Sequence, residues 1–193
     1  MVNSAAMIQL QALSLQRGKS RLLEQVDLRI HPGQKIGVIG ANGSGKSSLF
    51  KLILGELHHD SGELLIPKGW QIAHMAQEVE FLQRTALDHV LDGDGPLRQL
   101  QQAIAAAEAE DRHHQLGELH AQYDAIDGYS AVARAEQLLH GLGFSQADCQ
   151  RSVSEFSGGW RIRLNLAQAL MCRSDLLLLD EPTAGMARHD TNR

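Results

Sequence analysis

A glycine-rich stretch, "GANGSGKSS" at residues 40–48, has the composition of a loop that holds phosphate. Its spacing matches G-x-x-x-x-G-K-[ST], a pattern that is informative when a strand precedes it and a helix follows. Glycines let the backbone curl so that several N–H groups point inward, and the N-terminus of a helix attracts anions. The loop therefore predicts a triphosphate site made by Gly40, Ala41, Asn42, Gly43, Ser44, Gly45, Lys46, Ser47 and Ser48.

Two side chains of this loop have distinct expected roles. Lys46 would supply a mobile positive charge to the β- and γ-phosphates, and the hydroxyl of Ser47 is the expected Mg²⁺ ligand. The alternative is a glycine-rich structural turn, which would not require a lysine and a serine in this register.

A second candidate group lies near the end of the sequence, where "LLLL" at 176–179 is followed by Asp180 and Glu181. The apolar run predicts a buried strand, and ligands of α/β sheets bind at the carboxyl ends of such strands. Asp180 is the expected Mg²⁺ partner, and Glu181 would orient or deprotonate an attacking water. Taken alone, this pattern equally fits an ordinary strand with an acidic end. With the upstream loop it predicts nucleotide hydrolysis.

The elements that must position these residues follow from hydrophobic periodicity. Alternation of apolar and polar residues predicts half-buried strands at 8–16 and 25–31, and "KIGVIG" at 35–40 predicts a strand buried on both faces. Short strands are expected at 62–67 and 70–75, a helix at 157–170 and a buried strand at 174–180.

Three segments emerge along the chain: a β-rich part at 1–83 that carries the loop, a helical part at 84–148, and an α/β part at 149–193. The helical part repeats apolar residues at three-to-four spacing, as amphipathic helices do. It holds four basic and eleven acidic side chains. An acidic surface repels phosphate backbones, so this part is a poor candidate for gripping nucleic acid unaided.

Composition narrows the protein class further. No apolar run approaches the roughly 20 residues of a membrane helix, and we see no secretory signal. The two cysteines, Cys149 and Cys172, have no metal-type spacing, which fits a reduced, cytoplasmic chain.

Taken together, these motifs resemble those of the ATP-binding cassette (ABC) ATPases, because "FSGGW" at 156–160 is similar to the signature of that family. The resemblance implies a P-loop NTPase core with an antiparallel β subdomain and a helical subdomain. It implies that Ser157, Gly158 and Gly159 contact the γ-phosphate of ATP held by a facing cassette. Gln77 matches the glutamine that approaches Mg²⁺ and the attacking water.

Within the family, the spacer before 157 and the stretch 156–183 resemble the first cassette of the YheS-type branch of the ABC-F proteins. This implies a protein with two cassettes and no membrane domain that hydrolyses ATP with Mg²⁺ and acts on the ribosome. The helical insertion would be the arm that contacts the ribosome, through basic residues such as Arg98, Arg112 or Arg134. The alternatives are the ATP-binding subunit of a transporter and a non-catalytic nucleotide-binding remnant.

Two departures from the family pattern qualify the resemblance. Arg17 stands where transporter cassettes place an aromatic residue on adenine, and a guanidinium can also stack on a base; an exposed turn arginine is the alternative. After "DEPT", residues 184–187 read Ala-Gly-Met-Ala, where the family has "NHLD", and no switch histidine follows. We therefore expect a C-terminally incomplete first cassette with negligible ATP hydrolysis by itself.

Overall fold

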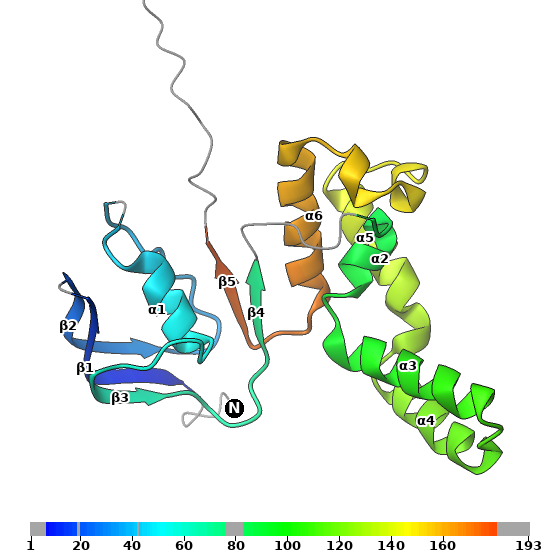
Figure 1. Ribbon diagram of the computed structural model, residues 1–193, viewed down its shortest axis with the longest axis horizontal. Helices are drawn as coiled ribbons and strands as arrows, with labels where there is room; N and C mark the ends of the chain where they lie inside the picture. The colour runs from blue at the N-terminus through cyan, green and yellow to red at the C-terminus, as the bar shows by residue number, and fades with distance from the viewer. Residues whose placement is uncertain (1–6, 19, 42, 76–82, 181–193) are drawn as a thin grey trace, which may run out of the picture. The chain divides into compact units, whose positions relative to one another are not determined.

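The computed structural model describes residues 7–18, 20–41, 43–75 and 83–180, and it divides into two compact units. Unit 1 comprises residues 1–72 and unit 2 residues 73–193. Figure 1 shows that unit 1 carries most of the strands and unit 2 most of the helices. The three-part division at 83 and 148 expected from the sequence stays a prediction.

The described residues of unit 1 form an antiparallel sheet in the order β2-β1-β3 and one helix, α1. The elements are β1 (Ile8–Arg17), β2 (Ser20–Ile30), α1 (Lys46–Ile53) and β3 (Ser61–Leu65). The strands predicted at 8–16, 25–31 and 62–67 are confirmed, although β2 begins earlier than its alternating pattern suggested.

A bulge in β1 reverses which alternate residues face inward. Ile8 and Leu10 are buried, and so are Leu13 and Leu15, which have the opposite parity. A strictly alternating strand would expose one of these pairs. The register shifts between Leu10 and Leu13, where Ala12 has φ 43°, so one extra residue turns the second half of the strand over.

The prediction of a buried strand at 35–40 is wrong. The segment forms no strand, and Ile39 is 94% exposed. Its apolar, β-branched composition favours an extended conformation only where neighbouring strands accept its backbone hydrogen bonds. In the described part of the chain, the sheets are β2-β1-β3 and β4-β5, and neither includes it.

Unit 2 contains five helices among its described residues, confirming the helical character predicted for 84–148 and the helix predicted at 157–170. They are α2 (Ala86–Leu91), α3 (Gly95–Ala109), α4 (His113–Ala125), α5 (Ala131–Gly141) and α6 (Gly158–Met171), with short 3-10 helices at Gly128–Ser130, Asp148–Gln150 and Val153–Glu155. Helices α3 and α4 form a hairpin within the helical insertion, and the role of this insertion as a ribosome-binding arm stays a prediction. Within the described ranges, no helix has both the length and the apolar character needed to cross a membrane.

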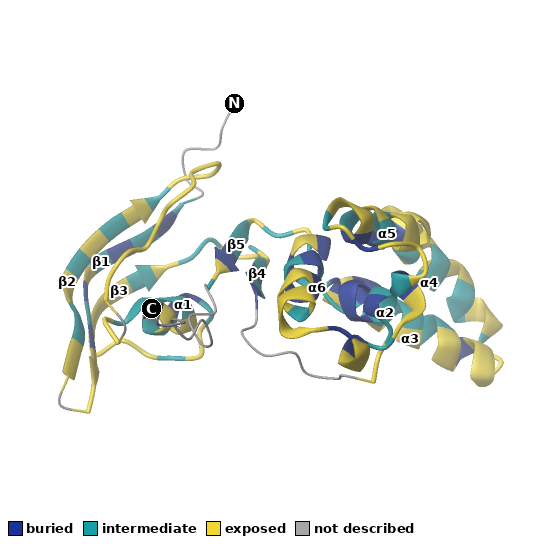
Figure 2. Cartoon of the chain, turned by 90° about the horizontal axis from the view of Figure 1, so that it is seen from above, coloured by how far each residue is buried: buried dark blue, intermediate teal, exposed yellow. Residues whose placement is uncertain are grey.

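The core of unit 2 lies between α2, α5 and α6, where buried residues gather on the facing sides of the helices (Figure 2). Val90, Leu139 and Leu164 contribute fully buried side chains from these three helices. A polar pair is buried with them: His89 Nε2 and Asn165 Oδ1 are 3.1 Å apart, joining α2 to α6. Buried polar groups need partners, so this bond fixes how the two helices align.

A small sheet joins β4 (Ile72–Met75), whose first residue ends unit 1, to β5 (Leu176–Leu179) of unit 2. Both strands were predicted from sequence and both are confirmed. Figure 1 shows them side by side and running in the same direction, so their carboxyl ends lie at one edge. Burial of β5 is partial, because Leu178 is buried while Leu179 is half exposed.

Candidate nucleotide site

The glycine-rich loop of unit 1 leads into α1 as the sequence predicted. Gly45 precedes the helix with φ 102°, and the amide of Leu49 donates to its carbonyl at 2.9 Å, which closes the first turn. No side chain caps α1, and its first turn has no acidic residue. The first amides of a helix have no intrahelical partner, so this N-terminus favours an anion.

The Lys46 ammonium also lies at this loop. Lys46 Nζ donates to the carbonyl oxygens of Gly40 and Ala41, at 2.7 and 3.0 Å. The ammonium therefore lies against the start of the loop while its backbone belongs to α1. An ammonium that is bonded only to two neutral carbonyls can move to bind a phosphate, because its hydrogen bond to a charged phosphate is stronger than its bonds to the carbonyls.

Backbone conformation and packing explain one of the glycines. Gly45 has φ 102°, and a Cβ there would press on the Leu22 side chain at 3.1 Å. Asn42 lies outside the described residues. Ser47 and Ser48 lie in the first turn of α1, and the role of the Ser47 hydroxyl as a Mg²⁺ ligand stays a prediction.

The acidic part of the candidate site belongs to unit 2. Asp180 directly follows β5, at the edge where the carboxyl ends of β4 and β5 meet. Gln77 and Glu181, the predicted water-handling residues, lie outside the described residues. The roles of Asp180, Gln77 and Glu181 toward the loop stay predictions.

The "FSGGW" segment forms an open helix N-terminus. Ser157 is the N-cap of α6, but its hydroxyl makes no capping bond, and no acidic residue lies in the first turn. A Cβ on Gly158 or Gly159 would meet nothing within 4 Å. All three residues are exposed, so the hydroxyl and amides of this turn are accessible to an anion from outside.

A set of contacts that the motif did not reveal holds this segment in place. Phe156 is buried under the Arg151 guanidinium, 4.6 Å from its ring centre, and Trp160 packs edge-on against Phe144 at 4.7 Å. Arg151 is anchored by Asp148 at 2.7 Å. The clustering of three of the chain's few aromatic residues at 144–160 was the available signal in the sequence.

Asp148 is itself strongly stabilised as an anion. Hydrogen bonds from the Ser145 hydroxyl and amide, followed by the bond from Arg151, lower the pKa of its carboxyl to about 2. The carboxylate therefore stays charged at any physiological pH and keeps Arg151 over Phe156.

Arg17 is exposed at the end of β1, opposite Ser20 across the hairpin. The contact of Arg17 with adenine stays a prediction.

Comparison with known proteins decides the family. The sequence model described as "ABC transporter" matches residues 23–184. The chain belongs to the ABC transporter family. The cassette fold is also that of solved ABC structures: a nucleotide-free ATP-binding cassette from an ABC transporter superposes with a TM-score of 0.61 at 24% identity, covering 94% of this chain and 71% of that one. A putative metal-chelate type ABC transporter gives 0.62 at 22% identity, covering 93% and 61%. The fold class predicted from the sequence is confirmed.

Its relatives place this ABC cassette in the ABC-F branch, as the resemblance predicted. It is 49% identical over 177 residues to the probable ATP-binding protein YheS of Escherichia coli K12, covering 92% of this chain and 28% of that protein. YheS of Haemophilus influenzae is 47% identical, with 89% and 27% covered. Human ATP-binding cassette sub-family F member 3 is 36% identical, with 94% and 26% covered. The chain thus spans little more than a quarter of the length of these relatives.

Proposed function

We propose that this cassette binds ATP with Mg²⁺ through residues 40–48 and, within a full-length ABC-F protein, takes part in its hydrolysis. The observation that carries the proposal is the loop itself: a glycine-shaped turn, the ammonium of Lys46, and an uncapped α1 N-terminus meet at one place. Together these groups offer positive charge and a helix N-terminus to a triphosphate.

The remaining residues have roles that complement the loop. Ser47 and Asp180 would hold Mg²⁺, which shields the charge of the phosphates and draws electrons from the bond that breaks. Glu181 would accept a proton from the attacking water, and Gln77 would orient that water. Ser157, Gly158 and Gly159 would present their hydroxyl and amides to ATP bound by a facing cassette. The isolated chain would then hydrolyse ATP at a negligible rate.

The binding step is tested by titrating the 193-residue chain with a fluorescent ATP analogue and Mg²⁺. We expect Lys46→Ala to weaken binding roughly tenfold or more, since it removes the charge-assisted bond. Lys51→Ala is the matched control, because Lys51 lies in the last turn of the same helix. Equal affinities for Lys46→Ala and the unaltered chain would refute the assignment of the loop. Arg17→Ala, in the same titration, tests the adenine contact.

Action on the ribosome is the proposed role of the full-length protein, and similarity to ABC-F relatives supports it over a transporter role. The charge of the helical part limits how contact would occur. All four arginines within 84–148 form ion pairs with acidic side chains of the same part: Arg84, Arg98, Arg112 and Arg134. RNA phosphates would therefore have to replace acidic side chains that already pair with these arginines.

Ribosome co-sedimentation of the full-length protein, with Glu181→Gln to retain ATP, tests this role. Sedimentation with ribosomes that requires ATP supports it. Partition with membranes instead would favour the ATP-binding subunit of a transporter.

A further inference from the structure

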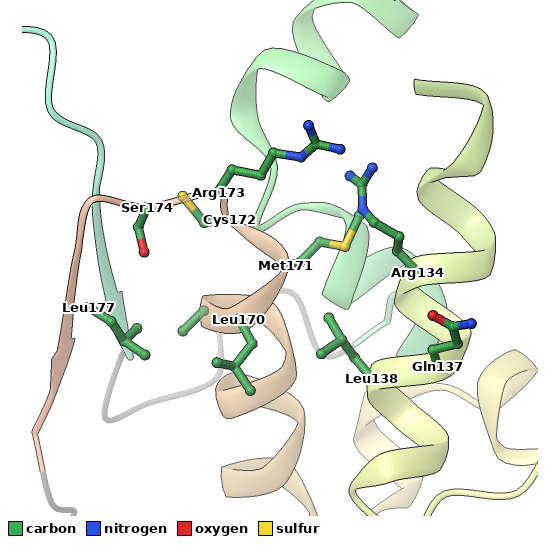
Figure 3. Close-up of a pocket in the computed structure, with 10 residues that line it drawn as sticks. Arg134, Gln137, Leu138, Leu170, Met171, Cys172, Arg173, Ser174 and Leu177 are labelled. Atoms are coloured by element: carbon green, nitrogen blue, oxygen red, sulfur yellow. The ribbon is translucent and has the colours of Figure 1, made fainter. Parts of the chain in front are cut away.

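Unit 2 has a hollow of about 480 Å³ that the nucleotide residues do not line (Figure 3). It lies between α5, the carboxyl end of α6 and the start of β5. Aliphatic side chains from all three elements line it: Leu138, Leu170, Met171 and Leu177. Its volume is within the range of roughly 300–1,000 Å³ that is usual for small-molecule sites.

Two guanidinium groups lie at one end of this hollow, those of Arg134 and Arg173. Both contact the same residue: Arg173 Nη2 is 2.6 Å from the Asp127 carboxylate, and Arg134 Nη1 donates to the Asp127 carbonyl at 3.3 Å. Arg134 also pairs with Asp94 at 3.2 Å. Two cations therefore lie beside an apolar floor, one from the acidic part at 84–148 and one from 149–193.

Arg173 can exchange its partner. The side chains of Arg173 and Asp127 are 53% and 65% exposed, and such exposed pairs are weakly held. A guanidinium has five N–H donors, and a single one accounts for the contact to Asp127. Arg173 therefore has donors left for a second carboxylate, which it could bind in bidentate fashion.

We propose that the hollow binds a small amphipathic carboxylate. Its head group would lie on Arg173 and Arg134, in place of the Asp127 carboxylate on Arg173, and its aliphatic body would lie along Leu138, Leu170 and Leu177. The arginines supply the charge complement, and the leucines supply apolar surface that a short chain can cover.

Octanoate is a suitable probe for the 193-residue chain labelled with ¹³C at leucine and methionine methyl groups. We expect saturable NMR shifts at Leu138, Leu170 and Met171, with affinity on the order of millimolar for so small a ligand. Octylammonium, which has the same aliphatic body and the opposite charge, should leave these signals unshifted.

Two variants should change the affinity in opposite directions. Arg173→Gln should weaken octanoate binding about fivefold, because it removes the accessible charge. Asp127→Asn should strengthen it about threefold, because it releases Arg173. Asp127 has φ 51°, a conformation that asparagine tolerates, so the loop keeps its shape. Arg163→Gln is the control, since Arg163 is an exposed arginine of α6 that lies over Trp160.

Alkylation of Cys172 gives an independent readout, because its thiol lines the hollow while Cys149 is buried. Octanoate should slow the reaction of Cys172 with iodoacetamide in the unaltered chain and much less in Arg173→Gln. The proposal is overturned if octylammonium shifts the same methyl signals, if neither variant changes the octanoate affinity, or if the shifts do not saturate.

Discussion

Gly62 shows how a single residue determines the shape of the sheet in unit 1. It lies in β3 opposite the bulge of β1, with φ 85°, and a Cβ there would overlap the carbonyl oxygens of Gln11 and Ala12. The bulge is held from the other side as well, since the Ala12 amide donates to Asp27 at 2.8 Å. The reversal that buries both halves of β1 therefore requires a glycine opposite it.

Gly62→Ala should lower the free energy of unfolding of unit 1 by about 2–4 kcal/mol, because it combines a left-handed backbone with a backbone collision. Gly69→Ala is the matched control: it has the same φ of 85° and nothing within 4 Å of a Cβ. It should cost about 1 kcal/mol, from backbone conformation alone. Urea unfolding followed by circular dichroism measures both. Equal losses would show that the collision contributes nothing.

At the scale of elements, most strands and helices could be predicted because their patterns depend on local periodicity. The repeats in 84–148 predicted helices, and "LLLL" predicted β5. The bulge was not predicted: "IQLQALSLQ" alternates regularly up to Ala12 and Leu13 breaks the parity, but the pattern alone does not show that the strand continues through a bulge at this point. The strand predicted at 35–40 is wrong for a different reason: a strand depends on partner strands elsewhere in the chain, and the composition of a segment carries no information about them.

The joint between α2 and α6, formed by His89 and Asn165, should make the free energy of unfolding depend on pH. Burial lowers the pKa of His89 below its usual range, so the folded chain keeps the ring neutral where the unfolded chain takes up a proton. The free energy of unfolding should therefore fall as pH drops below about 6.5, the pKa of an unfolded histidine, and the loss continues until the folded ring also titrates.

Replacing His89 with glutamine, whose amide can still donate to Asn165, should reduce this pH slope between about pH 7 and 5. His113→Gln is the control, because the His113 side chain is 77% exposed. Chemical unfolding at a series of pH values measures the slopes. If the His89→Gln chain and the unaltered chain lose stability in parallel, His89 does not control the joint.

At the scale of the whole molecule, the residues predicted to bind the nucleotide belong to two compact units. The loop at 40–48 belongs to unit 1, whereas Asp180 and the Ser157–Gly159 turn belong to unit 2. Motif spacing predicted these residues because local backbone geometry determines a phosphate loop or a helix N-terminus. It could not predict that the arginines of 84–148 are all paired, because side-chain pairing depends on the tertiary arrangement.

Each unit has its own apolar core, so we expect the two to unfold in separate steps. The chain provides a reporter for each, since of its two tryptophans Trp70 lies in unit 1 and Trp160 in unit 2. In the Trp160→Phe chain, Leu52→Ala should lower the free energy of unfolding seen by Trp70 by about 2–5 kcal/mol, and Leu139→Ala should not. In the Trp70→Phe chain, Leu139→Ala should lower the free energy of unfolding seen by Trp160, and Leu52→Ala should not.

ATP with Mg²⁺ links this unfolding behaviour to the site. A ligand stabilises the part of a protein that binds it, so the transition reported by Trp70 should shift to higher urea, and Lys46→Ala should abolish the shift. Fluorescence-detected urea unfolding of the single-tryptophan chains measures all of these effects. If Leu52→Ala and Leu139→Ala lower both signals equally, the chain unfolds as one cooperative body and the two units are not independent. In that case ATP would stabilise unit 1 and unit 2 together.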